Sequence, residues 1–179
     1  MYTFIALLSI TWTQLFAIEV YFSPSPDCEK RIIKAIDESK TEILAAVYSI
    51  NNGAIADALT RAKKRGIALR FLTDSTQATQ KYSKVLPLKK AGLDIRLHSK
   101  FKIEHNKFGV YDSKLVSTGS FNWTRPAAEA NSENCVFIDD ADTVSKFHQR
   151  FDYLWRENTN DASLAKIEKI LSKKLTQSQ

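Results

Sequence analysis

A chain of 179 residues is long enough to bury one hydrophobic core and too short for two domains of ordinary size. Its composition, 44% hydrophobic and 26% charged with five glycines and four prolines, excludes a largely disordered protein. The formal net charge of +6 favours a polyanionic partner but does not identify one.

The first 17 residues contain no charged side chain, and the run from Phe4 to Ala17 is mostly apolar. This pattern is typical of a secretory signal peptide that is cleaved after Ala17, although no Lys or Arg precedes it. A buried helix is the alternative, but the first expected core strand begins directly afterwards. We therefore expect residues 1–17 to be a signal peptide or an uncleaved membrane anchor, and residues 18–179 to form one periplasmic or secreted domain.

Turn residues and hydrophobic periodicity divide the rest of the chain into strands and helices. Asp27 is expected to cap a helix whose apolar face includes Ile32 and Ile36. Gly66 and Gly92 are expected to end the next two helices. The expected strands are 19–22, 42–50, 68–73, 94–98, 107–111, 115–118 and 135–138, and the expected helices are 27–39, 54–65, 80–91, 141–156 and 163–175.

Strands that alternate with helices of this length predict an α/β fold with parallel strand pairs. After His98 the alternation stops, because strands 107–111 and 115–118 are separated by three turn residues and form a hairpin. We therefore expect a mixed, mostly parallel β-sheet flanked by helices on both faces. No internal repeat or linker divides the chain.

Positive charge is concentrated in the middle of the chain. Between Thr60 and Arg125, fifteen Lys and Arg residues stand against four Asp and Glu residues, a net charge of +11, while the remainder is net −5. A basic segment of this kind is suited to binding a ligand that carries many phosphate groups. Solvated helix faces account for part of the same charge.

Cys28 and Cys135 are the only cysteines in the sequence. In an oxidising compartment they would form one disulfide, and in a reducing one they would remain free thiols. The sequence leaves both states open, and the spacing matches no metal motif.

The hairpin region carries polar residues in the pattern H-x-K-x4-D-x6-G-S-x-N. Its fixed positions are His105, Lys107, Asp112, Gly119, Ser120 and Asn122. Residues two apart on an extended chain point to the same face, so each side of the hairpin would present two of these side chains together. Lys107, Ser120 and Asn122 are donors suited to phosphate oxygens, Gly119 would leave room for a ligand, and neutral imidazole is a nucleophile. The lysine argues against a metal site, because its ammonium would repel a cation.

This pattern resembles the signature of the phospholipase D superfamily at every fixed position. The resemblance implies a phospholipase D-like fold, no metal or cofactor, and attack by His105 on phosphorus to give a covalent phosphohistidine. It also implies that Glu133, in an N-S-E-N sequence, orients the imidazole through a hydrogen bond. Asp112 is a supporting candidate that a hairpin turn explains equally well. His98 and His148 match no motif and are expected to be structural.

The motif occurs once in this chain, whereas larger members of the superfamily carry it twice. The implied mechanism needs a second histidine to protonate the leaving oxygen. We therefore expect a two-fold homodimer that brings two copies of His105 to one phosphate.

The chain resembles most the small bacterial endonucleases of the Nuc type, through Val47-Tyr48-Ser49, a K-K-R-G sequence, G-S-F-N and N-S-E-N. We therefore expect a non-specific, metal-independent endonuclease that acts on DNA or RNA. Lys102, Arg125 and the rest of the basic segment would follow the phosphate backbone. Phe121 or Trp123 would stack on bases or pack in the core.

Two other functions stay open. A phospholipid hydrolase, for example one that acts on cardiolipin, would use the same site, because the site recognises a phosphodiester and little else. An apolar N-terminal anchor would suit that function. A catalytically silent nucleic-acid-binding module is the third candidate, but binding alone would not require a histidine between phosphate donors.

Overall fold

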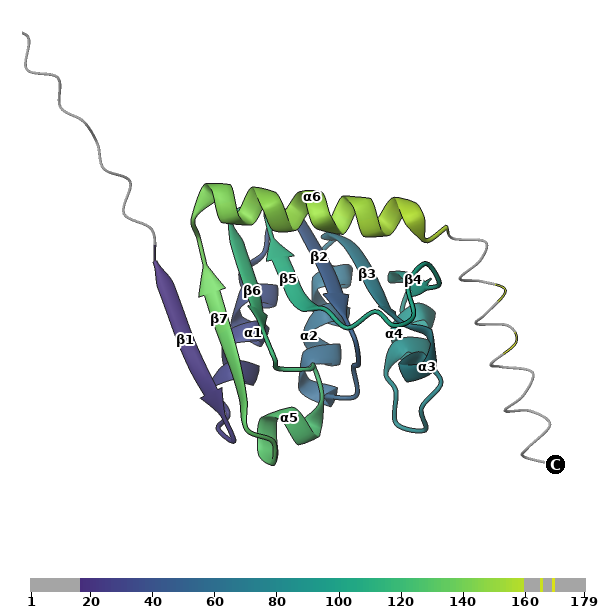
Figure 1. Ribbon diagram of the computed structural model, residues 1–179, viewed down its shortest axis with the longest axis horizontal. Helices are drawn as coiled ribbons and strands as arrows, with labels where there is room; N and C mark the ends of the chain where they lie inside the picture. Colours follow the sequence, from purple (N-terminus) through teal and green to yellow (C-terminus); the bar gives the residue numbers. More distant parts are fainter. Residues whose placement is uncertain (1–16, 160–164, 166–168, 170–179) are drawn as a thin grey trace, which may run out of the picture.

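The computed structural model describes residues 17–159, 165 and 169, and its core is one seven-stranded β-sheet (Figure 1). Most of the expected signal segment and of the expected helix 163–175 lies outside the described residues. No described helix is long and apolar enough to cross a membrane. In chain order the elements are β1 (Ile18–Ser23), α1 (Asp27–Glu38), β2 (Glu42–Val47), α2 (Gly53–Lys64), β3 (Ala68–Asp74), α3 (Ser75–Ala78), α4 (Val85–Lys90), β4 (Asp94–His98), β5 (Lys107–Tyr111), β6 (Leu115–Gly119), α5 (Arg125–Glu129), β7 (Glu133–Ile138) and α6 (Ala141–Glu157).

The strand order β1-β7-β6-β5-β2-β3-β4 combines both kinds of pairing. The pairs β2–β3 and β3–β4 are parallel, and the other four are antiparallel. The mixed α/β sheet expected from the sequence is confirmed, but the expectation of mostly parallel pairing is wrong. Parallel neighbours need a long crossover connection, and the three residues between β5 and β6 are too few to provide one.

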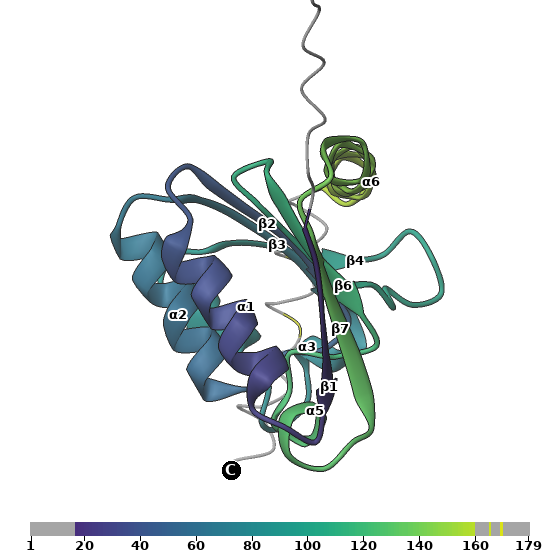
Figure 2. The same cartoon turned by 90° about the vertical axis from the view of Figure 1, so that its left-hand side faces the viewer.

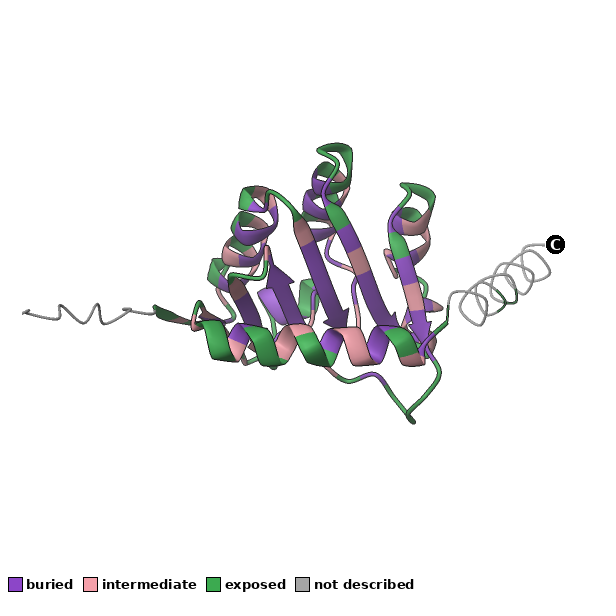
Figure 3. Cartoon of the chain, turned by 90° about the horizontal axis from the view of Figure 1, so that it is seen from above, coloured by how far each residue is buried: buried purple, intermediate pink, exposed green. Residues whose placement is uncertain are grey.

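Alternate residues of the central strands pack into two hydrophobic layers. Ile43, Ala45 and Val47 of β2 face the layer beneath α1 and α2, while Leu44 and Ala46 face α6. Figure 2 shows α1 and α2 on one side of the sheet and α6 on the other. Seen from above, the strands are largely buried while the outer surfaces of the helices are exposed (Figure 3). Helices on both faces are therefore confirmed.

The helix expected over 80–91 is shorter than predicted, because α4 begins only at Val85. An unpredicted short helix, α3, precedes it. The Asp74 carboxylate accepts hydrogen bonds from the backbone N–H groups of Thr76 and Gln77 (2.8 and 3.1 Å) and so caps α3. Residues 79–84 consequently form an exposed loop between two short helices.

The start of α1 also differs from the prediction. Pro26 is the N-cap residue and makes no side-chain capping bond, so the expectation that Asp27 caps the helix is wrong. Asp27 lies in the first turn, where its carboxylate accepts a hydrogen bond from Ser25 Oγ (2.6 Å). A negative charge there still interacts favourably with the helix dipole.

A disulfide joins Cys28 of α1 to Cys135 of β7. Of the two states that the sequence leaves open, the structure has the bridged one. The bond connects residues 107 positions apart and fastens α1 to a strand near the edge of the sheet. Cross-links over long loops stabilise a fold chiefly by restricting the unfolded chain.

Candidate active site

Most of the motif residues lie along one edge of the sheet that is formed by strand ends, where β2 and β6 end and β5 and β7 begin. Because β5 runs antiparallel to β2 and pairs with β6, its first residue lies beside the end of β2 and the end of β6. His105 and Lys107 lie at the entry to β5, and Ser120 and Asn122 follow the end of β6. Glu133 is the first residue of β7 and lies at the same edge.

His105 is exposed and is held between two anchored residues. The carbonyl of Asn106 accepts a hydrogen bond from the N–H of Tyr48 (2.8 Å). The buried carboxylate of Glu104 accepts one from the N–H of Asn106 (3.1 Å), and the N–H of Glu104 donates to Asp74 (3.2 Å). The Tyr48 ring lies against the imidazole, with 4.7 Å between ring centroids. These contacts position the imidazole while leaving it open to solvent.

Lys107 is half-buried beside the histidine. Its ammonium donates a hydrogen bond to the carbonyl oxygen of His105 and lies 5.1 Å from the centroid of the Tyr48 ring. Burial lowers the pKa of Lys107, although the carboxylates of Glu133 and Glu104 act in the opposite direction. An anion bound here would further favour the charged form of the lysine.

Ser120 and Glu133 form a hydrogen-bonded pair. Ser120 Oγ donates to the Glu133 carboxylate and accepts a hydrogen bond from the N–H of Asn134 (3.1 Å). The second carboxylate oxygen of Glu133 accepts from Asn131 Nδ2 (3.0 Å). Among the described residues of one chain, Glu133 makes no hydrogen bond to His105, so the expected Glu133–imidazole contact is wrong for a single chain. The two carboxylate oxygens have other donors.

Asn122 has an unsatisfied side-chain acceptor. Its Oδ1 atom is buried, and no hydrogen-bond donor in the described part of the chain reaches it. An unpaired buried acceptor costs about 1–3 kcal/mol. A donor from a ligand or a second chain would remove that cost.

Gly119 has a different purpose from the one expected. A Cβ atom at this position would lie 2.3 Å from the carbonyl oxygen of Asn134, and φ is +145°. The glycine therefore allows β6 to approach the backbone of β7 closely, and the space is not open to a ligand. This close approach places Ser120 against the start of β7.

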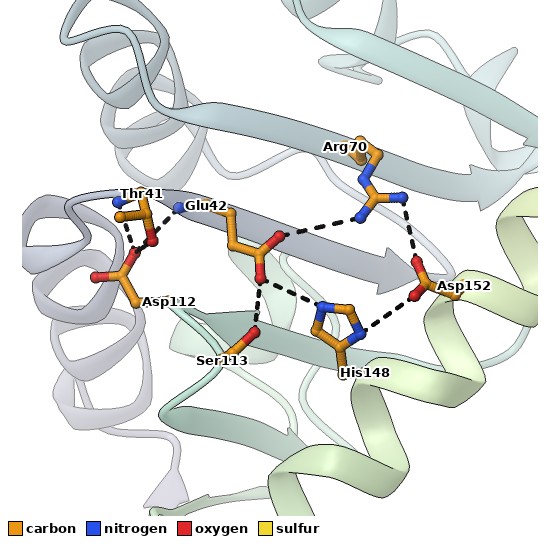
Figure 4. A network of polar contacts seen from close by, with 7 residues as sticks. All are labelled: Thr41, Glu42, Arg70, Asp112, Ser113, His148 and Asp152. Atoms are coloured by element: carbon orange, nitrogen blue, oxygen red, sulfur yellow. Dashed lines mark hydrogen bonds and ion pairs between the residues drawn. The ribbon is translucent and has the colours of Figure 1, made fainter.

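Asp112 lies at the opposite end of the hairpin, roughly 16 Å along β5 from Lys107 at 3.3 Å per residue. Its carboxylate accepts four hydrogen bonds, from the N–H groups of Lys40, Thr41 and Glu42 and from the Thr41 hydroxyl (2.8 to 3.0 Å). Figure 4 shows those from Thr41 and Glu42. Partial burial raises the pKa of Asp112, but the bonds from Thr41, Lys40 and Glu42 outweigh it and lower the pKa below its ordinary value. The structure therefore separates Asp112 from the other candidates and gives it a structural role.

His148 belongs to a polar network at that same end of the hairpin. Its ring lies between the carboxylates of Glu42 (3.3 Å) and Asp152 (3.2 Å), and Arg70 reaches both carboxylates (Figure 4). His98 is buried beside Glu104, with 3.8 Å between Nδ1 and the carboxylate. Both histidines lie in contacts that hold the fold together, in agreement with their expected structural role.

The three expected substrate-binding residues have different surroundings. Trp123 is 1% exposed and packs against Phe71, with 5.8 Å between ring centroids, so stacking of Trp123 on bases is wrong. Phe121 is buried as well. Arg125 is exposed at the start of α5 and pairs with Glu129 (2.8 Å). Lys102 is exposed in the loop before His105, and its contact with substrate stays a prediction, as does that of Arg125.

Sequence reasoning missed Tyr48, Glu104 and Asn131 as site residues. Tyr48 directly follows the buried strand β2, a position at which side chains reach a sheet edge, and that signal was available. Glu104 next to the motif histidine was a weaker signal. The contact between Asn131 and Glu133 depends on a local turn that the sequence pattern does not reveal. Among the described residues, no group of three or more His, Cys, Asp or Glu is arranged as a set of metal ligands.

Comparison with known proteins agrees with this site. The family model described as "Cardiolipin synthase, PLD-like domain" matches residues 32–155. The chain belongs to the phospholipase D superfamily. Among its relatives, a protein named "Phospholipase D" from Rickettsia conorii is 34% identical over 134 residues, 75% of this chain and 67% of that protein. A mitochondrial cardiolipin hydrolase from Chlamydomonas reinhardtii is 31% identical over 134 residues, 75% of this chain and 60% of that protein.

Solved structures relate this phospholipase D superfamily member to the Nuc type. Nuc, a phospholipase D family member from Salmonella typhimurium, is 30% identical with a TM-score of 0.75, and the match covers 81% of this chain and 97% of that one. NucT from Helicobacter pylori is 25% identical with a TM-score of 0.76, covering 81% of this chain and 99% of that one. The phospholipase D-like fold and the Nuc-type resemblance expected from the sequence are thus confirmed.

Proposed function

We propose that the chain is a metal-independent endonuclease that hydrolyses DNA or RNA with little sequence preference, through a covalent intermediate on His105. The observation that carries the proposal is the exposed imidazole of His105 together with the half-buried Lys107 ammonium, which is hydrogen-bonded to the His105 backbone carbonyl and lies against the same Tyr48 ring as the imidazole. An imidazole nucleophile close to an ammonium group suits attack on an anionic phosphodiester, because the cation stabilises negative charge on the phosphoryl oxygens. The likeness to Nuc and NucT and the positive middle segment support nucleic acid as the substrate.

The roles of the residues follow from their chemistry. One imidazole nitrogen of His105 attacks phosphorus, a nitrogen–phosphorus bond forms, and the bond from phosphorus to the leaving oxygen breaks. Lys107 and Asn122 stabilise charge on the phosphoryl oxygens. Glu133 holds Ser120 in place, and the Ser120 hydroxyl joins the other donors when its hydrogen turns from the Glu133 carboxylate to a phosphoryl oxygen. His105 of a second copy protonates the leaving oxygen. It then takes a proton from the water that hydrolyses the phosphohistidine and frees the first histidine.

The test is a panel of substrates offered to the purified chain in the presence of EDTA: plasmid DNA, single-stranded DNA, RNA and cardiolipin vesicles. We expect cleavage of nucleic acid by the wild-type chain and at least a roughly thousandfold loss in His105→Ala. His148→Ala is the matched control, because it removes a histidine at the far end of the hairpin and should leave the rate unchanged. Substantial turnover by His105→Ala would sink the assignment, and inhibition by EDTA would contradict the histidine mechanism.

A phospholipid hydrolase is the second candidate, and the relatives named phospholipase D and cardiolipin hydrolase favour it. The same nucleophile and phosphate donors would act on a lipid phosphodiester. In the panel, cleavage of cardiolipin without cleavage of any nucleic acid would establish this function. Binding of nucleic acid without any turnover would instead indicate a silent binding module.

We also propose that the active enzyme is a homodimer in which two copies of His105 share one phosphate. A dimer that contains one His105→Ala chain would then lack either the nucleophile or the acid. Equal amounts of wild-type and variant chains, mixed and allowed to exchange, should lower the activity per wild-type chain to about half, since random pairing leaves half of the wild-type chains with a wild-type partner. Unchanged activity after complete exchange would show that each chain works alone.

Export to the periplasm or the medium is part of the proposal, with a membrane-anchored form as the alternative. The disulfide between Cys28 and Cys135 supports an oxidising compartment. Fractionation of the producing cells, followed by N-terminal sequencing, should recover the chain outside the cytoplasm with Ile18 or Glu19 at its end. Recovery of the full chain from the cytoplasm would contradict export.

A further inference from the structure

Two exposed aromatic side chains lie on the loops that leave the sheet at the His105 edge. Tyr82, in the loop between α3 and α4, is 70% exposed, and Phe101, in the loop between β4 and β5, is 44% exposed. Phe121 and Trp123, which the sequence offered for stacking or for core packing, are buried, whereas Tyr82 and Phe101, like Phe22 in β1, are exposed.

The α3–α4 loop is fastened to the segment after β2, whose Tyr48 contacts His105, and the β4–β5 loop runs directly into His105. Gln77 of α3 donates a hydrogen bond to the Tyr48 hydroxyl (2.9 Å), and the N–H of Lys84 donates to the carbonyl of Ile50 (3.0 Å). In the second loop, the N–H of Phe101 donates to His98 Nε2 (2.6 Å). In the sheet, β3 lies two strands from β5, about 10 Å away at 4.8 Å per strand. Both loops thus leave the sheet from strands close to the one that begins beside His105.

Positive charge accompanies each ring. Lys81 Nζ lies 5.3 Å from the centroid of the Tyr82 ring, and Lys84 follows two residues later. Lys102 follows Phe101, the Arg150 guanidinium lies 5.8 Å from the centroid of the Phe101 ring, and Lys100 is paired with Glu157 (2.7 Å). Neither 75–84 nor 99–103 contains an acidic residue. Basic residues interleaved with exposed aromatic rings suit a single strand, because the bases stack and the phosphates pair with cations.

The His98 ring restricts the Phe101 side chain before any base stacks on it. The two rings are stacked, with 5.4 Å between centroids and 13° between planes. One face of the phenylalanine is therefore supported from beneath, which reduces the freedom that it would lose on binding. A lipid surface would require a continuous apolar patch, whereas Tyr82 is flanked by Lys81 and by the polar Ser83.

We propose that Tyr82 and Phe101 form a stacking track for the unpaired bases of a single-stranded nucleic acid that enters the site from the β3–β4 side. This inference rests on the proposed nuclease function and adds a preference for single-stranded over double-stranded nucleic acid. The bases of a duplex are already stacked and paired, so they cannot use the track. The enzyme should consequently bind and cleave single strands more tightly and faster than duplexes of the same sequence.

The experiment measures binding of a fluorescent oligothymidylate by anisotropy, with full-length protein carrying His105→Ala to prevent cleavage. Tyr82→Ala and Phe101→Ala are added to this protein one at a time. Each should weaken binding about 10- to 100-fold, given the usual contribution of stacking per base. Tyr82→Phe keeps the ring and should keep the affinity. An abasic oligomer with the same number of phosphates should bind all these proteins equally. The thermal midpoint checks that each variant is folded.

The outcomes separate this inference from the proposed function. Unchanged oligothymidylate binding in the alanine variants overturns the stacking track, as does an equal loss for the abasic oligomer. The nuclease proposal fails on a different observation, namely the lack of His105-dependent cleavage of any nucleic acid. If the alanine variants lose binding to cardiolipin vesicles but not to the oligomer, the rings contact lipid and the inference is wrong.

Discussion

The two ends of the β5–β6 hairpin carry residues of one motif, yet their polar groups are satisfied to different degrees. At the turn, the Asp112 carboxylate accepts four hydrogen bonds. At the other end, Asn122 Oδ1 is buried without a donor in the described part of the chain, and His105 is exposed. Satisfied networks stabilise a fold, whereas a side chain exposed at the surface, as the His105 imidazole is, is available to a ligand. The comparison divides the motif into an end for chemistry and an end for folding.

The largest expected effect is on the rate of hydrolysis, at the end of the hairpin that carries His105. Asn122→Ala removes a candidate donor to the phosphoryl oxygens, so we expect hydrolysis to fall about 100- to 1000-fold. Folding should be little affected, because the lost oxygen has no partner that would be left unpaired. Initial rates together with thermal unfolding by circular dichroism measure both. A thermal midpoint lowered enough to explain the loss of rate would remove the distinction between the two ends.

The second expected effect is on stability at the turn. Asp112→Ala removes four hydrogen bonds and places alanine at φ +51°, so we expect a loss of about 2 kcal/mol in the free energy of unfolding, or roughly 6 °C in Tm. Asp112→Asn, which tolerates that φ, should lose less. The rate per folded molecule should stay within about twofold of wild type. A large loss of rate at a temperature where the variant is folded would return Asp112 to the active site.

The smallest effect concerns pH and lies away from both ends. The side-chain hydrogen bond from Arg31 lowers the pKa of Glu19 in β1 to about 2. A carboxylate with a lowered pKa stabilises the fold above its unfolded pKa, and that contribution is lost as the pH falls toward 2. Urea unfolding at pH 6 and pH 3 should therefore show a smaller decrease for Glu19→Gln than for wild type. Equal decreases would show that the Glu19–Arg31 pair does not contribute to acid sensitivity.

The sequence predicts the elements and the local part of the site well. Hydrophobic periodicity locates all seven strands, because burial on one or both faces leaves a signal within each segment. The spacing of the motif brings His105, Lys107, Ser120 and Asn122 to one edge, because a hairpin is a local structure. Strand order and direction depend on contacts between distant segments, which is why the proportion of parallel pairs was predicted wrongly.

The roles of single side chains are harder to predict for the same reason. Trp123 lies beside the motif in sequence, but it packs against Phe71 of β3, a contact that no local pattern contains. Glu133 was expected to contact the histidine, yet Ser120 and Asn131 are closer. Gly119 faces a backbone carbonyl of β7 where a ligand was expected. For Trp123 and Gly119 a partner distant in sequence decides what the residue does, and for Glu133 a residue of the preceding strand end and a local turn do so together.

The most direct test of the central claim is to trap the covalent intermediate on the wild-type chain. A labelled oligonucleotide is mixed with the enzyme, turnover is stopped by denaturation at alkaline pH, and peptide mass spectrometry locates the label. We predict a phosphoramidate on His105 that appears before free product and is absent from His105→Ala. Label on another side chain such as Ser120, or product formation without any protein-bound label, would contradict the account.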